Sequence, residues 1–275
     1  MADAMIAERI RIARRYVRAV DMTRDFTDPR ALEGYIVTPS VRDALARVTA
    51  GLAPGSTQRA FRVTGPYGAG KSSFGLLLAR LFTEVPNGGS ATDIARSAIS
   101  IEPSAFPAYI PIILVGRRTS LADELIRRII ESAAAEGRGR DELTAASAAH
   151  LMETRAAGAG DARAVLDLID GYARNVHAAT GSGVLLLIDE MGRYLEYAAT
   201  NQATEDPSLF QQLAERAGGA ASAPLSVIGF LHHRFSDYVA GLGEWIEGEW
   251  ARSAERYEEL AFQESTELTL FLLRV

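Results

Sequence analysis

The chain has 275 residues, 48% of them hydrophobic, so it can bury a substantial core in one large domain or two small ones. The sequence contains no run of eighteen apolar residues, and no apolar segment follows the arginine-rich first twenty residues. We therefore predict no membrane span and no secretory signal, and we expect a cytoplasmic protein. The absence of cysteine excludes disulfides and thiolate zinc sites, and the presence of only four histidines argues against a structural metal. The net charge of −6 argues against a broad nucleic-acid-binding surface.

Short apolar segments alternate with helical patterns along the chain. Residues 60–64 (AFRVT) form an apolar run that ends at a glycine, and residues 72–82 carry apolar side chains at helical spacing. Another helix is expected after Ser120, which is followed at capping-box spacing by Asp123. Near-continuous apolar strands separated by helices indicate an α/β fold, with a parallel sheet covered on both faces. The expected strands cover residues 60–64, 109–115, 184–188, 225–231 and 257–262.

The chain is predicted to divide into two regions. Residues 1–58 form an N-terminal helical and linker region that packs on the core. Its amphipathic helix at 7–20 is predicted to dock through an apolar face, although its arginines would also suit a membrane surface or nucleic acid. Residues 59–275 form the core, with a helical insertion at about 137–160 that includes a helix at 141–155.

The segment GPYGAGKS lies between the first strand and its helix and fits the pattern G-x-x-x-x-G-K-[ST] in full. Glycines let the backbone turn so that successive N–H groups point at phosphates, and the helix N-terminus adds partial positive charge. Lys71 is the only lysine in the chain, and its compact ammonium fits inside such a loop where a forked guanidinium does not. The predicted nucleotide-binding residues here are Gly65, Pro66, Tyr67, Gly68, Ala69, Gly70, Lys71, Ser72 and Ser73.

The third expected strand ends in two carboxylates, Asp189 and Glu190. Ligands of open α/β sheets bind at the carboxyl edge of the strands, so this pair is predicted to lie beside the phosphate loop. Asp189 and the Ser72 hydroxyl are predicted to hold Mg²⁺, and Glu190 to orient or deprotonate the attacking water. Strands that end in two acidic residues are common on protein surfaces. We assign this pair to a nucleotide site because a predicted phosphate loop precedes it in the chain.

These segments resemble those of a known group of proteins. GPYGAGKS, LLLIDE and SVIGFLHH are similar to the Walker A, Walker B and sensor-1 regions of the AAA+ and STAND P-loop ATPases, the additional-strand ASCE group. Residues 35–262 also resemble the N-terminal ATPase module of large bacterial ATP-binding proteins in anti-phage defence gene clusters. The resemblance implies a three-layer P-loop NTPase with a mainly parallel five-stranded sheet of order 5-1-4-3-2 and helices on both faces. It also implies a C-terminal helical lid, for which the chain lacks room after a helix expected at 265–273, so we expect a piece of a longer protein.

The resemblance extends to four further positions. His232 matches the sensor-1 place, where a polar side chain contacts the γ-phosphate or the attacking water, and His233 is the alternative if the strand runs one residue longer. Arg252 and Arg256 lie where AAA+ proteins often keep an arginine finger that acts on a neighbouring subunit, or they are surface residues. Tyr35 would pack against adenine, or it belongs to the core.

The resulting prediction is an ATPase that uses Mg²⁺, with Lys71, Glu190, His232, Arg252 and Arg256 as catalytic residues. It would serve anti-phage defence or DNA transactions, as a homo-oligomer or with DNA or partner proteins that bind parts outside this chain. The alternative is a nucleotide-gated interaction module with little turnover. A GTPase would need an NKxD motif, which a chain with one lysine lacks elsewhere. A small-molecule kinase would need an arginine-rich lid, for which residues 137–140 (GRGR) are the candidate.

Overall fold

The computed structural model describes residues 20–84, 89–99, 107–135, 142–156, 162–219, 223–238 and 244–262. The predicted helix at 265–273 and the loop at 137–140 lie outside the described residues, as does the helix at 7–20 except for its last residue. Over the part of the chain that the structure describes, none of the helices has the length and apolarity needed to span a bilayer.

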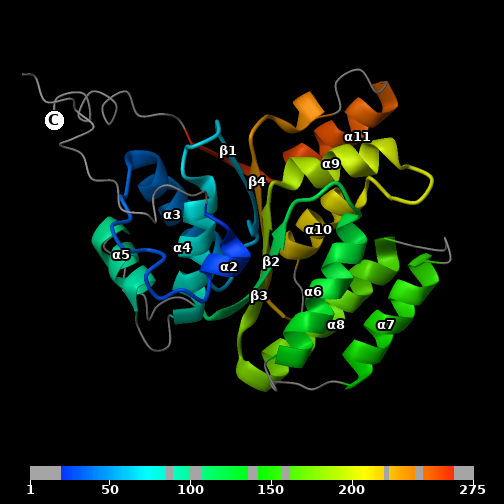
Figure 1. Ribbon diagram of the computed structural model, residues 1–275, viewed down its shortest axis with the longest axis horizontal. Helices are drawn as coiled ribbons and strands as arrows, with labels where there is room; N and C mark the ends of the chain where they lie inside the picture. The colour runs from blue at the N-terminus through cyan, green and yellow to red at the C-terminus, as the bar shows by residue number, and fades with distance from the viewer. Residues whose placement is uncertain are drawn as a thin grey trace, which may run out of the picture.

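Five strands form one sheet in the order β2-β3-β4-β1-β5, and every pairing among them is parallel. Read from the other edge, this is the expected order 5-1-4-3-2, so the predicted α/β class and strand order are confirmed (Figure 1). Three strands have the predicted bounds, the third extends one residue further at each end, and the fifth is shorter. The strands are β1 (Ala60–Thr64), β2 (Tyr109–Val115), β3 (Gly183–Asp189), β4 (Leu225–Leu231) and β5 (Glu258–Ala261).

The central strands owe their apolar sequences to their position. β3 and β4 are buried along their whole length because helices cover both faces of the sheet, so their sequences do not alternate between apolar and polar residues. The register pairs Thr64 with Leu231 and Val115 with Asp189, so the carboxyl ends of four strands lie at one edge of the sheet. The loops that follow β1, β2, β3 and β4 in sequence therefore all begin at that edge.

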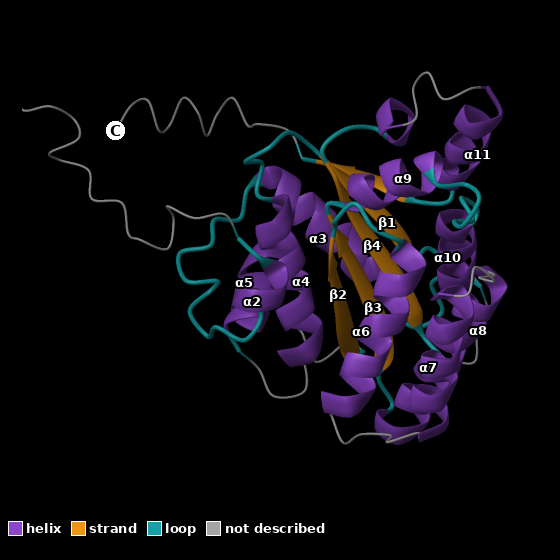
Figure 2. Ribbon diagram, turned by 45° about the vertical axis from the view of Figure 1, so that its right-hand side comes forward, coloured by secondary structure: helices purple, strands orange, loops and turns teal. Residues whose placement is uncertain are grey.

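Helices pack on both faces of the sheet, giving three layers (Figure 2). One layer surrounds a core that contains Phe74, Phe82 and Phe230, and the other surrounds Ile126, Tyr194 and Trp250. The first layer consists of α2 (Met22–Asp25), α3 (Pro39–Leu52), α4 (Lys71–Glu84) and α5 (Ser90–Ile99). The second consists of α6 (Leu121–Ala135), α7 (Glu142–Ala156), α8 (Ala162–Thr180), α9 (Met191–Thr200), α10 (Leu209–Gly218) and α11 (Glu244–Glu255).

Local sequence signals set several helix starts. Thr38 caps α3, with its hydroxyl accepting the Val41 N–H at 3.3 Å and Pro39 in the first turn. The Ser120 hydroxyl accepts the Asp123 N–H at 3.2 Å, which confirms the predicted cap of α6. The described part of residues 1–58 packs on the α4 side of the sheet, where Met22 and Leu45 are fully buried.

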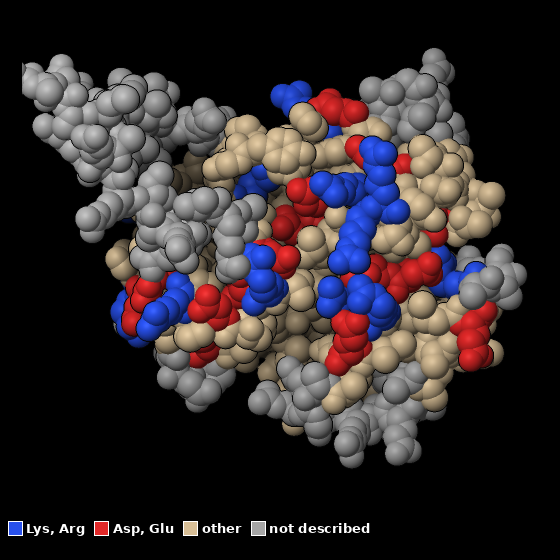
Figure 3. All heavy atoms as spheres, viewed as in Figure 1, with Lys and Arg blue, Asp and Glu red and all other residues tan. Residues whose placement is uncertain are grey.

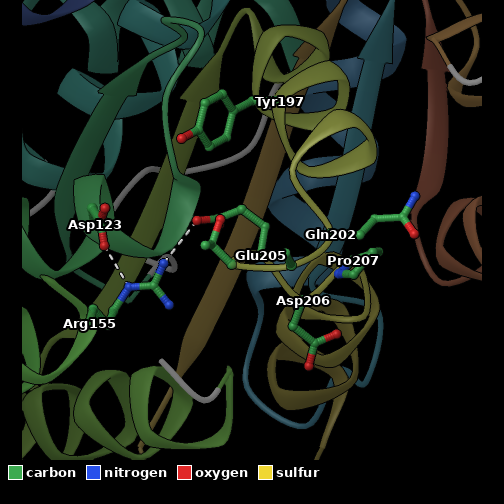
Figure 4. Close-up of a pocket in the computed structure, with 9 residues that line it drawn as sticks. Asp123, Arg155, Tyr197, Gln202, Glu205, Asp206 and Pro207 are labelled. Carbon is green, nitrogen blue, oxygen red and sulfur yellow. Dashed lines mark hydrogen bonds and ion pairs between the residues drawn. The ribbon is translucent and has the colours of Figure 1, made fainter. Parts of the chain in front are cut away.

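The inserted helix α7, predicted at 141–155, is tied to its neighbours by one buried arginine (Figure 4). The Arg155 side chain is only 8% exposed, and its Nε donates to Asp123 Oδ1 at 2.5 Å. Its Nη2 donates to Ser120 Oγ and to Glu205 Oε1, both at 3.0 Å. Glu205 is itself buried, and this burial raises the pKa of its carboxyl, against the opposing effects of the Ser120 hydroxyl and the Arg155 charge. One guanidinium therefore joins α7 to the start of α6 and to the loop between α9 and α10.

Replacing Arg155 with leucine is expected to lower the free energy of unfolding by about 3 kcal/mol, because it leaves the Glu205 carboxylate buried without its cation. Urea denaturation of the variant measures the loss. The matched control removes both charges, Arg155→Leu with Glu205→Leu, and should recover part of that loss. A double variant less stable than the single one would contradict this account of the cluster.

Candidate active site

The phosphate loop, residues 65–72, connects β1 to α4 at the carboxyl edge of the sheet. Gly68 and Gly70 have φ angles of 82° and 84°, in the left-handed region that residues with a Cβ rarely adopt. Helix α4 begins at Lys71, so the loop delivers its N–H groups and the helix N-terminus to the same place. The strand, loop and helix expected around GPYGAGKS are all present.

The Lys71 ammonium lies inside the loop. Its Nζ donates to the carbonyl oxygens of Gly65 and Pro66 at 2.6 and 2.8 Å, and it lies 3.0 Å from His232 Nδ1. Burial lowers the pKa of Lys71, while the charges of Asp189 and Glu190 act in the opposite direction. Three acceptors around one nitrogen match the three protons of an ammonium, whereas a planar guanidinium spreads its donors over three nitrogens.

Asp189 ends β3 directly beside the start of α4. Its Oδ1 accepts the Ser72 hydroxyl at 3.2 Å and the Glu190 backbone N–H at 3.0 Å. Burial raises the pKa of Asp189, and these two hydrogen bonds act against that shift. The described residues contain no cluster of three or more His, Cys, Asp or Glu side chains that could hold a metal. A hydroxyl and a carboxylate nonetheless fit Mg²⁺, which takes one or two protein oxygens and completes its shell with phosphates and water.

Glu190 has an unusual backbone conformation. With φ 51° and ψ 40°, it has the one left-handed backbone among the non-glycine residues that the structure describes. Such strain costs of order 1 kcal/mol or more and tends to occur at functional sites. Here the conformation ends β3 and starts α9 within one residue, and it turns the Glu190 side chain towards the end of β4.

His232 lies between Lys71 and Glu190. Its Nε2 is 3.3 Å from Glu190 Oε1, and its ring stacks on the Tyr67 ring with 3.6 Å between centroids. Since the Lys71 ammonium can only donate, Nδ1 must accept and Nε2 must carry the proton that goes to Glu190. Burial, followed by the Lys71 charge, lowers the pKa of His232, which favours this neutral tautomer.

Tyr238 fixes the end of β4 where the two histidines lie. Its hydroxyl accepts the backbone N–H groups of His232 and His233, at 3.1 and 3.2 Å. The Tyr238 ring packs so closely on α9 that a Cβ at Gly192 would overlap it. His233 is exposed and has its ring against Tyr238, so of the two candidates His232 is the one in contact with Lys71 and Glu190.

The His232 pKa has a consequence for stability. Because its folded-state pKa lies below the ordinary 6.5, neutral His232 contributes stability that is complete above pH 6.5 and is lost as the pH falls through the folded-state pKa. We expect the difference in free energy of unfolding between the wild type and His232→Asn to be larger at pH 7.5 than at pH 5. Urea titrations at both pH values measure it, and a difference independent of pH would contradict the assigned protonation state.

A cavity of about 580 Å³ connects these groups, and a second, of about 390 Å³, adjoins it. Figure 3 shows acidic and basic side chains gathered around a hollow in this face of the molecule. Tyr67, Glu190, Arg193 and His232 line both cavities. The larger one is also lined by Val20, Asp21, Arg24, Gly68, Gly70, Lys71, Ser72, Ser73, Val115, Gly116 and Asp189.

Three predicted residues lie elsewhere. Tyr35 packs against the core on the α4 side and does not line either cavity. The residues of the N-terminal region that line the larger cavity are Val20, Asp21 and Arg24. Arg256 precedes β5 and pairs with Glu215 at 3.2 Å. Since Glu258 is in register with Phe61, Arg256 lies at the amino edge of the sheet, opposite the phosphate loop, and Arg252 is one helical turn earlier. A role for these arginines would thus require a neighbouring chain.

Sequence reasoning did not identify Arg193, Tyr238 or Arg24 as site residues. Arg193 could have been found from its position three residues after Glu190, which is one turn along the following helix. No comparable signal exists for Tyr238, which reaches the site from a 3₁₀ helix after β4.

The strand order, the phosphate loop between β1 and α4, and the acidic pair at the end of β3 together define the P-loop NTPase fold. No family model matches the chain, and no curated protein matches it. Among solved structures, it is similar to the ORC2 protein of Aeropyrum pernix in its ADPNP and ADP complexes, with a TM-score of 0.46 and 12% identity. The match covers 90% of this chain and 55% of that one, so this chain spans about half of that protein's length. A likeness at this level adds no support for a particular function.

Proposed function

We propose that the chain binds ATP together with Mg²⁺ and hydrolyses the γ-phosphate. The observation that carries the proposal is the contact chain Lys71–His232–Glu190 beside the Ser72–Asp189 pair. Lys71, Glu190, Ser72 and Asp189 line one cavity, which supports assigning them as phosphate-binding ammonium, base for water and two Mg²⁺ ligands. These are the components that phosphoryl transfer to water requires.

Each residue has a distinct part in this proposal. The loop N–H groups and Lys71 bind the β- and γ-phosphates, for which Lys71 exchanges its contacts with Gly65 and Pro66. Ser72 and Asp189 would hold Mg²⁺, which neutralises phosphate charge when bound. Glu190 orients the attacking water and takes its proton, and His232 holds Glu190 Oε1 in place.

Other parts of the proposal rest on motif resemblance. The Walker-like segments support placing the chain among AAA+ or STAND ATPases, as a module of a larger bacterial protein in anti-phage defence. Arg252 or Arg256 would then act on the site of a neighbouring copy in a homo-oligomer. Light scattering with and without ATP and Mg²⁺ tests that last point, since a chain that stays monomeric at high concentration with ATP leaves both arginines without a site to serve.

The activity itself is tested by two measurements on the same preparation. Binding of a fluorescent ATP analogue and steady-state phosphate release are followed with Mg²⁺, with EDTA, and with GTP in place of ATP. We expect binding and release with ATP that are lost in EDTA, and weaker effects with GTP. Tight binding without release would favour the nucleotide-gated interaction module, and the absence of binding would overturn the proposal.

A further inference from the structure

Among the described residues, Arg193 is the arginine that contacts the proposed base. Its Nε lies 2.7 Å from Glu190 Oε2, and its side chain, 52% exposed, lines both cavities where they meet. Arg24, which also lines the larger cavity, is instead engaged with Asp25 through Nε at 2.8 Å and Nη2 at 3.0 Å. The resemblance led us to expect Arg252 or Arg256 at the site, but Arg256 lies at the amino edge of the sheet. Arg193 already lies beside Glu190 in the same chain.

The position of Arg193 is unfavourable for a purely structural role. It lies in the first turn of α9, three residues after the N-cap Glu190, where the exposed N–H groups carry partial positive charge. A cation there is repelled by the helix dipole, which favours acidic residues at this end. A half-exposed ion pair contributes little to stability in return. The placement therefore points to a use at the site.

Arg193 and His232 restrain the same carboxylate from two sides. His232 Nε2 lies within hydrogen-bond distance of Oε1 and Arg193 Nε forms an ion pair with Oε2, so each oxygen of the Glu190 carboxylate has one partner. A carboxylate has about four acceptor positions, so these two contacts leave room for a water molecule to donate a proton. Proton abstraction depends on the orientation of the base, and restraining that orientation before the reaction raises the rate.

We propose that Arg193 is a positioning residue, which holds the Glu190 carboxylate in the orientation that accepts a proton from the attacking water. This inference rests on the proposed ATP hydrolysis. It gives an arginine of the same chain a role at the site, and this role differs from the arginine finger that the sequence suggested for Arg252 or Arg256 of a neighbour.

Kinetics of five variants test the inference: Arg193→Ala, Arg193→Lys, Arg96→Ala, Glu190→Gln, and Arg193→Ala combined with Glu190→Gln. We expect Arg193→Ala to lower kcat for phosphate release by roughly 10- to 100-fold while the Kd of a fluorescent ATP analogue changes less than about twofold. Arg193→Lys should restore part of kcat, because an ammonium can still bind one carboxylate oxygen. The matched control is Arg96 on α5, which is 51% exposed, pairs with Asp93 three residues earlier and lines neither cavity, and its variant should keep the wild-type kcat. In the Glu190→Gln background, removing Arg193 should change the residual rate less than about twofold.

Each other outcome counts against the inference. An unchanged kcat in Arg193→Ala, alongside loss of turnover in Glu190→Gln, would overturn the role of Arg193 and leave the proposed ATPase intact. A raised kcat would mean that Arg193 restrains Glu190 from reacting, and a raised Kd with unchanged kcat would make it a nucleotide contact. If the wild-type chain binds ATP without releasing phosphate, the hydrolysis proposal fails and this inference fails with it. Thermal unfolding of Arg193→Ala should match the wild type, so a kinetic loss cannot be attributed to misfolding.

Discussion

Replacing Lys71 with alanine should weaken ATP binding so far that the variant is mostly empty at concentrations just sufficient to saturate the wild type. The Nζ atom lies inside the phosphate loop within hydrogen-bond distance of three acceptors, and the variant leaves that position without a cation. Losing one partner of a buried, hydrogen-bonded charge pair costs about 2–5 kcal/mol, which corresponds to a roughly 30- to 5000-fold rise in Kd. Titration with a fluorescent ATP analogue measures the change.

Two further variants at this position separate charge from shape. Lys71→Met keeps the aliphatic stem without the ammonium and should lose affinity as alanine does. Lys71→Arg keeps the charge, and we expect it to lose at least about tenfold in affinity, because a forked guanidinium does not fit acceptors arranged around one nitrogen. Thermal unfolding of all three variants is the control for folding. Wild-type affinity in Lys71→Ala would disprove the assignment of the phosphate loop.

Replacing Glu190 with glutamine should stop turnover and leave nucleotide binding in place. The amide keeps the size of the side chain and an acceptor for one of its two contacts, but it cannot take a proton from water. Loss of a general base typically costs about 10²- to 10⁴-fold in rate. Phosphate release under steady state measures kcat, and a binding titration on the same sample verifies that the ATP site persists.

The matched control for Glu190 is Glu196, six residues further along α9, which pairs with the exposed Arg118. Glu196→Gln should retain the wild-type rate. Turnover that survives in Glu190→Gln would transfer the role of base to another group and would remove the basis for assigning Arg193.

The sheet and the core of the site could be predicted because their signals are local in sequence. β2 has its predicted bounds, and the loop at 65–72 starts a helix as expected, since glycines, lysine and serine set the backbone within eight residues. The acidic pair follows from one apolar strand that reaches the carboxyl edge. The order of the strands came from the resemblance and could not have been obtained from periodicity.

What could not be predicted depends on contacts between distant segments. The choice between His232 and His233 is made by the Tyr238 hydroxyl, which fixes the last residues of β4 through two backbone N–H groups. The location of Arg256 depends on the register of β5 against β1, which no local pattern encodes. Tyr35 and the N-terminal residues at the cavity depend on how a segment before β1 folds back onto α4.

The left-handed backbone at Glu190 also affects what laboratory selection for thermal stability would do to the activity of this protein. Glycine adopts this conformation without strain, so Glu190→Gly would relieve a cost of order 1 kcal/mol while removing the proposed base. A screen that rewards only heat resistance would therefore enrich inactive chains at this position. Libraries intended to make the protein more robust should hold residue 190 constant, or should couple survival to catalysis.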